Sequence, residues 1–179
     1  MPDEPLIPPD ALPRGFRFAA VTAGIKASGK PDFAVAVADR PASAAAMFTS
    51  NQIQAAPITI GRRHLQRSGG FVRVVAVNSG NANCATGAVG LSACEQVCRA
   101  AAETFGCSAH EVFPSSTGII GVPLPAEKLV AALPEAQKKL SLDADSFAQA
   151  ILTTDTRAKV AHATITISGK SVRIAGVCK

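Results

Sequence analysis

The sequence contains no tryptophan and no tyrosine, and phenylalanine, with eight residues of 179, is its only aromatic amino acid. Proteins that bind nucleic acids by base stacking need aromatic faces, so this composition argues against that class. The basic residues give a formal net charge of +5, but they are scattered, with one short cluster at residues 62–64. Such a cluster is typical of a solvated face, so we expect no nucleic-acid partner, and the mild positive field suits anionic small substrates.

Long apolar runs and metal-ligand spacings are also missing. No run approaches the ~18–20 residues of a membrane span, and the N-terminal residues lack the basic and apolar regions of a signal peptide. The five cysteines include no Cys-x-x-Cys pair, and His64, His110 and His162 show no ligand spacing among themselves or with the cysteines. We therefore expect reduced thiols, no metal, no membrane contact, a cytoplasmic location, and histidines at surface or half-buried positions.

What the sequence does contain is material for a core. Hydrophobic residues make up 47% of the chain, mostly as Ala, Val, Ile and Leu, and the length fits one domain. Residues 1–13 are rich in proline and are expected to form a flexible arm, which leaves residues 14–179 as a single domain. Strand-like and helix-like segments alternate, so the predicted fold class is α/β or α+β, a layered sandwich of sheets flanked by helices.

The hydrophobic pattern places the elements. Strands are expected at residues 16–25, 33–38, 44–49, 71–77, 112–113, 160–167 and 172–177, and helices at 62–66, 89–105, 125–133 and 143–152. Asp39-Arg40-Pro41 should end the second strand, and Pro134 should end the third helix. The last two strands should form a hairpin. Because the sequence stops on a strand, we expect another chain or a continuation to complete the sheet.

Three polar segments follow apolar elements, at residues 78–87, 115–121 and 153–156, and such loops often carry ligand chemistry. In the second, Thr117 and Gly118 are expected at a strand-to-loop turn. A threonine hydroxyl and the next backbone N–H can then face one oxygen, as in an oxyanion hole. From these residues alone an ordinary turn is the favoured interpretation.

The other two segments leave alternatives open. Residues 78–87 either shape the floor of a site or pin a loop through asparagine side chains, and the structural role is slightly favoured. Asp155 is interpreted as a local cap, and the less favoured alternative is that it orders Thr153. Neither a phosphate-binding loop nor a dinucleotide-binding fingerprint is present, so a nucleotide ligand is not expected.

Four motifs occur together in an order that resembles a known family. They are Asn-Ser-Gly-Asn-Ala-Asn-Cys-Ala-Thr-Gly (78–87), Ser-Thr-Gly-Ile-Ile-Gly (116–121), Thr-Thr-Asp-Thr (153–156) and Gly-x-x-Lys (176–179). They resemble the α chain of the ornithine acetyltransferase family, and the resemblance includes Gly24-Ile25-Lys26 and runs from about Gly15 to Lys179. It implies a precursor that cuts itself before a threonine, which becomes the N-terminal nucleophile of a β chain. It also implies acetyl transfer from N-acetylornithine to glutamate in arginine biosynthesis.

The resemblance assigns roles to four residues of this sequence. Thr117 and Gly118 would form the oxyanion hole, and Thr153 and Lys179 would bind substrate. The implied fold resembles that of N-terminal-nucleophile enzymes, with mixed sheets completed by the β chain in an α2β2 assembly. No cofactor is implied, although some members also use acetyl-CoA as a co-substrate. The family pattern continues past Gly-x-x-Lys to the cleaved threonine, so this chain alone is expected to be inactive.

Two other functions stay open. One is the α chain of a different self-processing hydrolase, such as an aminopeptidase with a similar split. The other is a non-catalytic binding subunit, which a chain without a nucleophile would also fit. An assay of acetyl transfer against peptide hydrolysis separates them.

Overall fold

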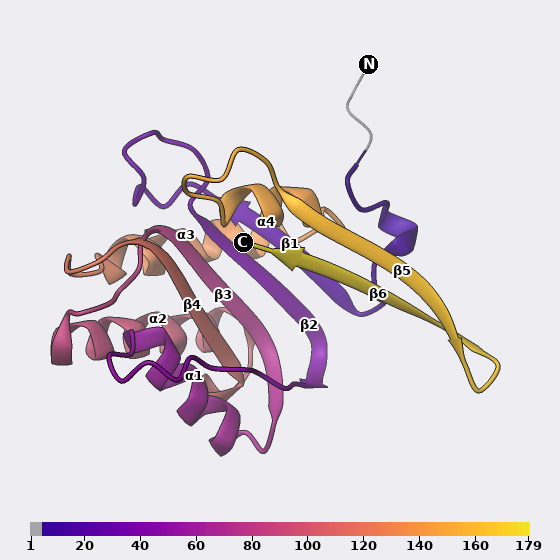
Figure 1. Cartoon of the computed structure of the whole chain (residues 1–179), viewed down its shortest axis with the longest axis horizontal. Coiled ribbons are helices and arrows are strands. Elements are labelled where there is room, and N and C mark those ends of the chain that lie inside the picture. The colour runs from indigo at the N-terminus through magenta and orange to yellow at the C-terminus, as the bar shows by residue number, and fades with distance from the viewer. Residues whose placement is uncertain (1–4) are drawn as a thin grey trace.

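The structure is a computed structural model that describes residues 5–179. It contains a four-stranded sheet in the order β1-β2-β3-β4 and a separate two-stranded hairpin (Figure 1). The strands are β1 (Phe16–Val21), β2 (Phe33–Ser43), β3 (Phe71–Asn81), β4 (Val112–Ile119), β5 (Lys159–Ile167) and β6 (Lys170–Cys178). The first three are antiparallel and β4 runs parallel to β3, so the larger sheet is mixed.

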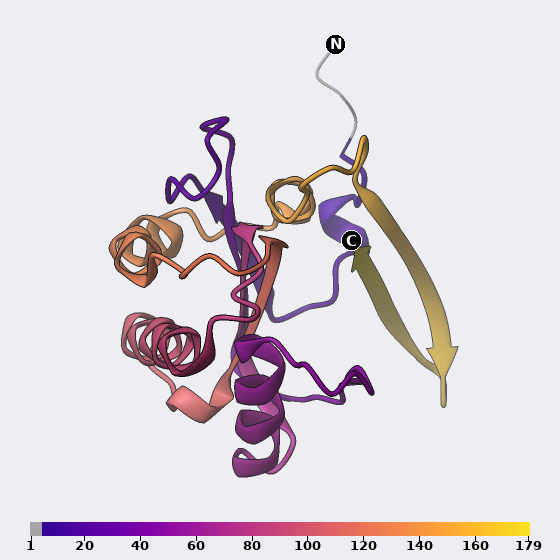
Figure 2. The same ribbon diagram turned by 60° about the vertical axis from the view of Figure 1, so that its left-hand side comes forward.

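Helices cover both faces of this sheet. They are α1 (Ala56–Arg67), α2 (Gly87–Phe105), α3 (Ala126–Lys138) and α4 (Ala144–Ala150), with short 3-10 turns η1 (Pro9–Ala11) and η2 (Ala109–Glu111). Figure 2 shows α2 and α3 on one face and α4 on the other. This arrangement confirms the predicted α/β class of sheets flanked by helices. Among residues 5–179, no helix combines the length and apolarity that crossing a bilayer requires.

The main core lies between the sheet and the pair α2 and α3. Alternate residues of the strands point into it, as the two-residue period of a strand dictates. Val35, Val74 and Val112 are fully buried in the same core cluster as Leu129 and Leu133 of α3. On the opposite face, Phe147 of α4 packs edge-on against Phe18, with ring centroids 5.9 Å apart. The small side chains of the strands let both helical layers approach the sheet closely.

The hairpin formed by β5 and β6 extends away from the sheet (Figure 1). Its length agrees with the prediction, and Ser168 and Gly169 make the turn with positive φ angles. Ile165, Ile167, Val172 and Ile174 stay between 37% and 54% exposed. Exposed apolar residues in such numbers on one hairpin indicate a surface that another polypeptide segment covers.

Local sequence signals account for several ends of elements. Helix α2 ends at Gly106, which adopts the left-handed conformation with a φ of 67°, as expected of a glycine stop. Ser108 and Glu111 form a capping box around the single turn η2. Asp143 caps α4 by accepting from the backbone N–H groups of Asp145 and Ser146.

The prediction for β2 and the segment after it was wrong. Strand β2 continues through Asp39-Arg40-Pro41 to Ser43, because a bulge absorbs these residues. Val37 pairs with Val74 and Ala42 with Val72, so residues 38–41 lie opposite Arg73 alone. A proline can lie in a bulge because the ladder loses no hydrogen bond there. The strand expected at residues 44–49 is not formed, and Met47 there is fully exposed.

Two helices are longer than predicted. Helix α1 begins at Ala56 instead of Arg62, with Pro57 in its first turn, where a missing N–H costs little. His64 of α1 is buried, contrary to the expected surface or half-buried position. Helix α3 runs through Pro134 to Lys138, where burial of its inner face outweighs the lost hydrogen bond.

The N-terminal arm also differs from expectation where it can be described. Residues 1–4 lie outside the described residues. Ile7 and Leu12 are buried against Ala144 of α4, and the backbone N–H groups of Leu6 and Ile7 donate to the carboxylate of Asp145. Residues 5–13 are therefore packed on the domain.

Candidate active-site cleft

A cleft of about 700 Å³ opens where β3 and β4 end. Its walls come from three segments that are distant in sequence: residues 25–28 after β1, Gly80 with residues 117–119, and Thr153 with Thr154 after α4. The cleft therefore brings together three of the four predicted site residues, Thr117, Gly118 and Thr153. Lys179 is not among the lining residues.

Thr117 and Gly118 lie in a strand, and the predicted strand-to-loop turn was wrong. Strand β4 continues to Ile119, and Ser79 pairs with Thr117 and Gly80 with Gly118 in the parallel ladder. Gly118 has a φ of 135°, and a Cβ there would fall on the backbone of Gly80 and Asn81. Only glycine fits this close approach of β4 to β3. The position of Thr117 at the cleft thus depends on the glycine that follows it.

The wall at residues 23–28 is held by one buried carboxylate. Asp32 is fully buried, and its oxygens accept hydrogen bonds from the backbone N–H groups of Ala23, Ile25 and Lys26 at 2.6–2.8 Å. Hydrogen bonds to a charged acceptor are among the strongest that a protein makes. The Asp32 backbone also bonds to Val21 and Ser79, which joins this loop to the sheet.

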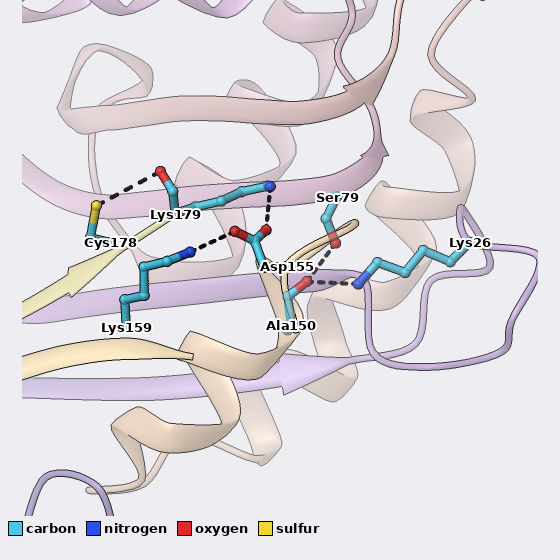
Figure 3. Close-up of polar contacts among 7 residues, drawn as sticks. All are labelled: Lys26, Ser79, Ala150, Asp155, Lys159, Cys178 and Lys179. Atoms are coloured by element: carbon cyan, nitrogen blue, oxygen red, sulfur yellow. Dashed lines mark hydrogen bonds and ion pairs between the residues drawn. The ribbon is translucent and has the colours of Figure 1, made fainter. Parts of the chain in front are cut away.

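The end of α4 is tied to the same wall. The backbone oxygen of Ala150 accepts from Nζ of Lys26 at 3.1 Å and from Oγ of Ser79 at 2.5 Å (Figure 3). Burial lowers the pKa of the Lys26 ammonium, and the charge of Asp32 partly opposes that shift. Since Thr153 follows α4 by a few residues, these bonds fix its approach to the cleft.

Lys179 is held by an acidic partner near Thr153. Its Nζ lies 2.6 Å from Oδ2 of Asp155, and Nζ of Lys159 lies 2.7 Å from Oδ1 of the same carboxylate (Figure 3). The hydrogen bond from Lys159, followed by that from Lys179, holds the pKa of Asp155 well below its usual range. Asp155 is thus the centre of an ion-pair cluster. The predicted role of a local cap did not include these two ion pairs.

The asparagines of residues 78–87 serve the backbone, which confirms the favoured structural role. Asn78 donates to the carbonyl of Asn81 at 2.8 Å and accepts from Oγ of Ser116 at 2.6 Å. Asn81 donates to the carbonyl of Val122 at 3.1 Å. Asn83 accepts from Thr86 at 3.0 Å. These bonds satisfy buried polar groups and hold the ends of β3 and β4 together. Gly80 alone of this segment lines the cleft.

Asp32 and Ser79 are structural members of the site that the sequence analysis did not single out. Asp32 stands in a cluster of turn residues that is typical of a solvated loop. Its burial becomes visible only once β1 and β2 are paired. The resemblance at Gly24-Ile25-Lys26 was the one signal that pointed to this wall.

Comparison with known proteins shows that two solved enzymes share the fold of this chain. Ornithine acetyltransferase from Mycobacterium tuberculosis, in a complex with ornithine, has a TM-score of 0.83 and 34% identity, with 94% of this chain and 89% of that chain covered. The arginine biosynthesis bifunctional protein argJ from Bacillus halodurans has a TM-score of 0.87 and 32% identity, with 94% and 87% covered.

The family model described as "ArgJ family" matches residues 17–179, and this chain belongs to that family. Two relatives are each named arginine biosynthesis bifunctional protein ArgJ. The protein of Rhodopirellula baltica is 48% identical over 172 residues, and that of Thermus thermophilus is 49% identical over 168 residues. Each alignment covers 94% of this chain but only 41% and 42% of the relative. The chain thus spans less than half the length of these relatives.

Proposed function

We propose that this chain is the α part of a cytoplasmic acetyltransferase of arginine biosynthesis, which moves the acetyl group of N-acetylornithine to glutamate. The proposal rests on one observation above all. Thr117, Gly118 and Thr153, to which the family resemblance gives roles, line one cleft although Thr153 follows α4 and the other two lie in β4. Residues 14–179 would act in this enzyme as one domain.

The nucleophile would come from the part of the relatives that this chain does not cover, as the N-terminal threonine of a β chain. Its hydroxyl attacks the acetyl carbonyl while its own amine accepts the proton. Negative charge develops on the carbonyl oxygen, where the hydroxyl of Thr117 and the N–H of Gly118 donate hydrogen bonds. The ornithine amine leaves with a proton, and the amine of glutamate then takes the acetyl group from the threonine. Acetyl-CoA would be a second acetyl donor, and no cofactor takes part.

Thr153 and Lys179 would bind the substrate beside the reacting carbonyl. A lysine ammonium is a suitable partner for the α-carboxylate that both amino-acid substrates carry. In the absence of substrate, Asp155 accepts from Lys179. A substrate carboxylate would share or replace this partner, and Lys159 would continue to balance Asp155.

The β chain would also complete the fold. The apolar residues that the hairpin exposes, Ile165, Ile167, Val172 and Ile174, suit a surface that such a chain covers. Two such pairs would make the α2β2 assembly.

The proposal is tested by expressing the whole gene and analysing what is purified. Mass spectrometry should find a second polypeptide that begins with threonine, and the complex should transfer acetyl groups from N-acetylornithine to glutamate. Hydrolysis of peptides without acetyl transfer would favour the aminopeptidase alternative. A stable complex with neither activity would favour a non-catalytic subunit.

A further inference from the structure

A second, smaller pocket shares no lining residue with the cleft. It has a volume of about 200 Å³, enough for a small ion with several waters. We call it the arginine pocket. Helix α1 contributes Arg63, His64 and Arg67, helix α2 contributes Glu95 and Arg99, and η2 contributes Ala109 and His110. The proposed acetyl transfer uses none of these residues.

The charges of the arginine pocket do not balance. Glu95 is its only carboxylate, and it serves two guanidinium groups: Nη1 of Arg63 lies 2.8 Å from Oε1, and Nη1 of Arg99 lies 3.8 Å from Oε2. Among residues 5–179, no salt bridge involves Arg67. Three guanidinium groups against one carboxylate leave two uncompensated positive charges. Arg63 and Arg67 are also spaced i,i+4 on α1, where like charges destabilise a helix.

The two histidines of the pocket add donors but no negative charge. Nδ1 of His64 lies 2.8 Å from the carbonyl of Val112, so it carries the hydrogen. The ring of His110 stands edge-on to that of His64 at 5.1 Å, and within residues 5–179 its buried Nδ1 has no hydrogen-bond partner. Burial lowers the pKa of His64, and the neighbouring His110 and Arg63 lower it further. An anion beside these rings would raise the pKa of His64 and so oppose the last two effects.

We propose that the arginine pocket binds a small dianionic oxyanion, of which inorganic phosphate is the simplest. Two negative charges match the two uncompensated positive charges. The planar fork of a guanidinium group fits two oxygens of a phosphate at once. Arg67 supplies a fork that no carboxylate within residues 5–179 occupies, and Arg99 supplies one that is weakly engaged at 3.8 Å.

The test is a titration of the purified complex with inorganic phosphate, followed by calorimetry at constant ionic strength. Saturable binding is expected, and Arg67→Gln should weaken it about tenfold, the effect of losing one charge-assisted hydrogen bond. Arg62→Gln is the matched control, because it removes the same charge from the same helix. Arg62 lies outside the pocket with its guanidinium over the ring of Phe48, so phosphate affinity should change less than about twofold.

A variant that binds phosphate more tightly provides a second, independent test. Glu95→Gln removes the competing carboxylate and should tighten phosphate binding by at least about threefold. Sulfate, a dianion of similar size, should compete with phosphate. In NMR spectra, phosphate should shift the imidazole signals of His64 and His110 and leave exposed His162 unchanged.

Three results would overturn the proposal. The first is equal weakening in Arg62→Gln and Arg67→Gln, which would indicate a general field effect. The second is the absence of saturable phosphate binding. The third is equally tight binding of acetate or chloride, which would show that the pocket does not select a dianion.

Discussion

The ammonium of Lys179 lies 2.6 Å from the carboxylate of Asp155, which places the last residue of the chain beside the polar segment that contains Thr153. The Lys179 side chain is only 22% exposed and the Asp155 side chain 14%. Both residues to which the family resemblance gives substrate contacts are therefore connected through one acid. Asp155 is not among the residues that line the cleft, so we regard it as a positioning residue.

Asp155→Asn should raise the KM for N-acetylornithine several-fold while kcat changes less. The lysine would lose its charged partner and would occupy many orientations before substrate binds. Steady-state kinetics of the complex measure both constants. Lys159→Gln is the control, since it leaves the pair of Asp155 and Lys179 in place. A large fall in kcat with KM unchanged would contradict a positioning role.

Asp32→Asn should destabilise the fold by about 2–3 kcal/mol, because an amide cannot accept from all three N–H groups that the carboxylate serves. The NH₂ group of asparagine would also face backbone donors in a fully buried site. Denaturant unfolding measures the loss. Asp39→Asn removes an exposed carboxylate paired with Arg17 and should cost less than about 1 kcal/mol. Equal effects of the two substitutions would refute the role given to Asp32.

Gly118→Ala should cost more stability than Gly29→Ala, although both glycines have positive φ angles. A methyl group at residue 29 meets open space, whereas one at residue 118 meets the backbone of β3. We expect about 1–2 kcal/mol for the conformational strain at residue 29. At residue 118, separation of β3 and β4 should take the loss beyond about 4 kcal/mol. Comparable unfolding midpoints for the two variants would show that β4 does not need the close approach.

Folding stability should fall as the pH is lowered through and below 6.5, in part because of His64. Burial lowers the pKa of His64 in the folded chain below its ordinary value of 6.5, so the unfolded chain takes up the proton first, and stability rises with pH in this window. His64→Gln should reduce the slope of unfolding free energy against pH by up to about 1.4 kcal/mol per pH unit. A slope that survives His64→Gln would assign the effect to other groups.

The parts of the fold that follow from local pattern could be predicted, and those that depend on pairing could not. Helix α2 carries an apolar stripe and ends at a glycine, and the hairpin carries two strands around a Ser-Gly turn, so both are visible in the sequence. The bulge at Pro41 and the continuation of α3 through Pro134 are not. In each case a proline that normally ends an element is tolerated because the surrounding packing or register compensates for it.

The site shows the same division. Motif order identified Thr117, Gly118 and Thr153, yet the residues alone suggested a turn where β4 continues as a strand. That strand exists because β3 lies beside it. The two strands are parallel and α2 separates them in the sequence, so no local signal reveals their pairing. The burial of Asp32 likewise depends on β1 and β2 closing around a loop that looks solvated.

The most direct test of the proposed acyl-transfer site is the turnover of Thr117 variants in the assembled complex. Thr117→Ala should lower kcat by about 10²–10³-fold with little change in substrate binding. Thr117→Ser should retain most activity, and Thr154→Ala, which removes another hydroxyl at the cleft, should have a small effect. Unchanged turnover in Thr117→Ala would contradict the role of this hydroxyl in stabilising the developing oxyanion.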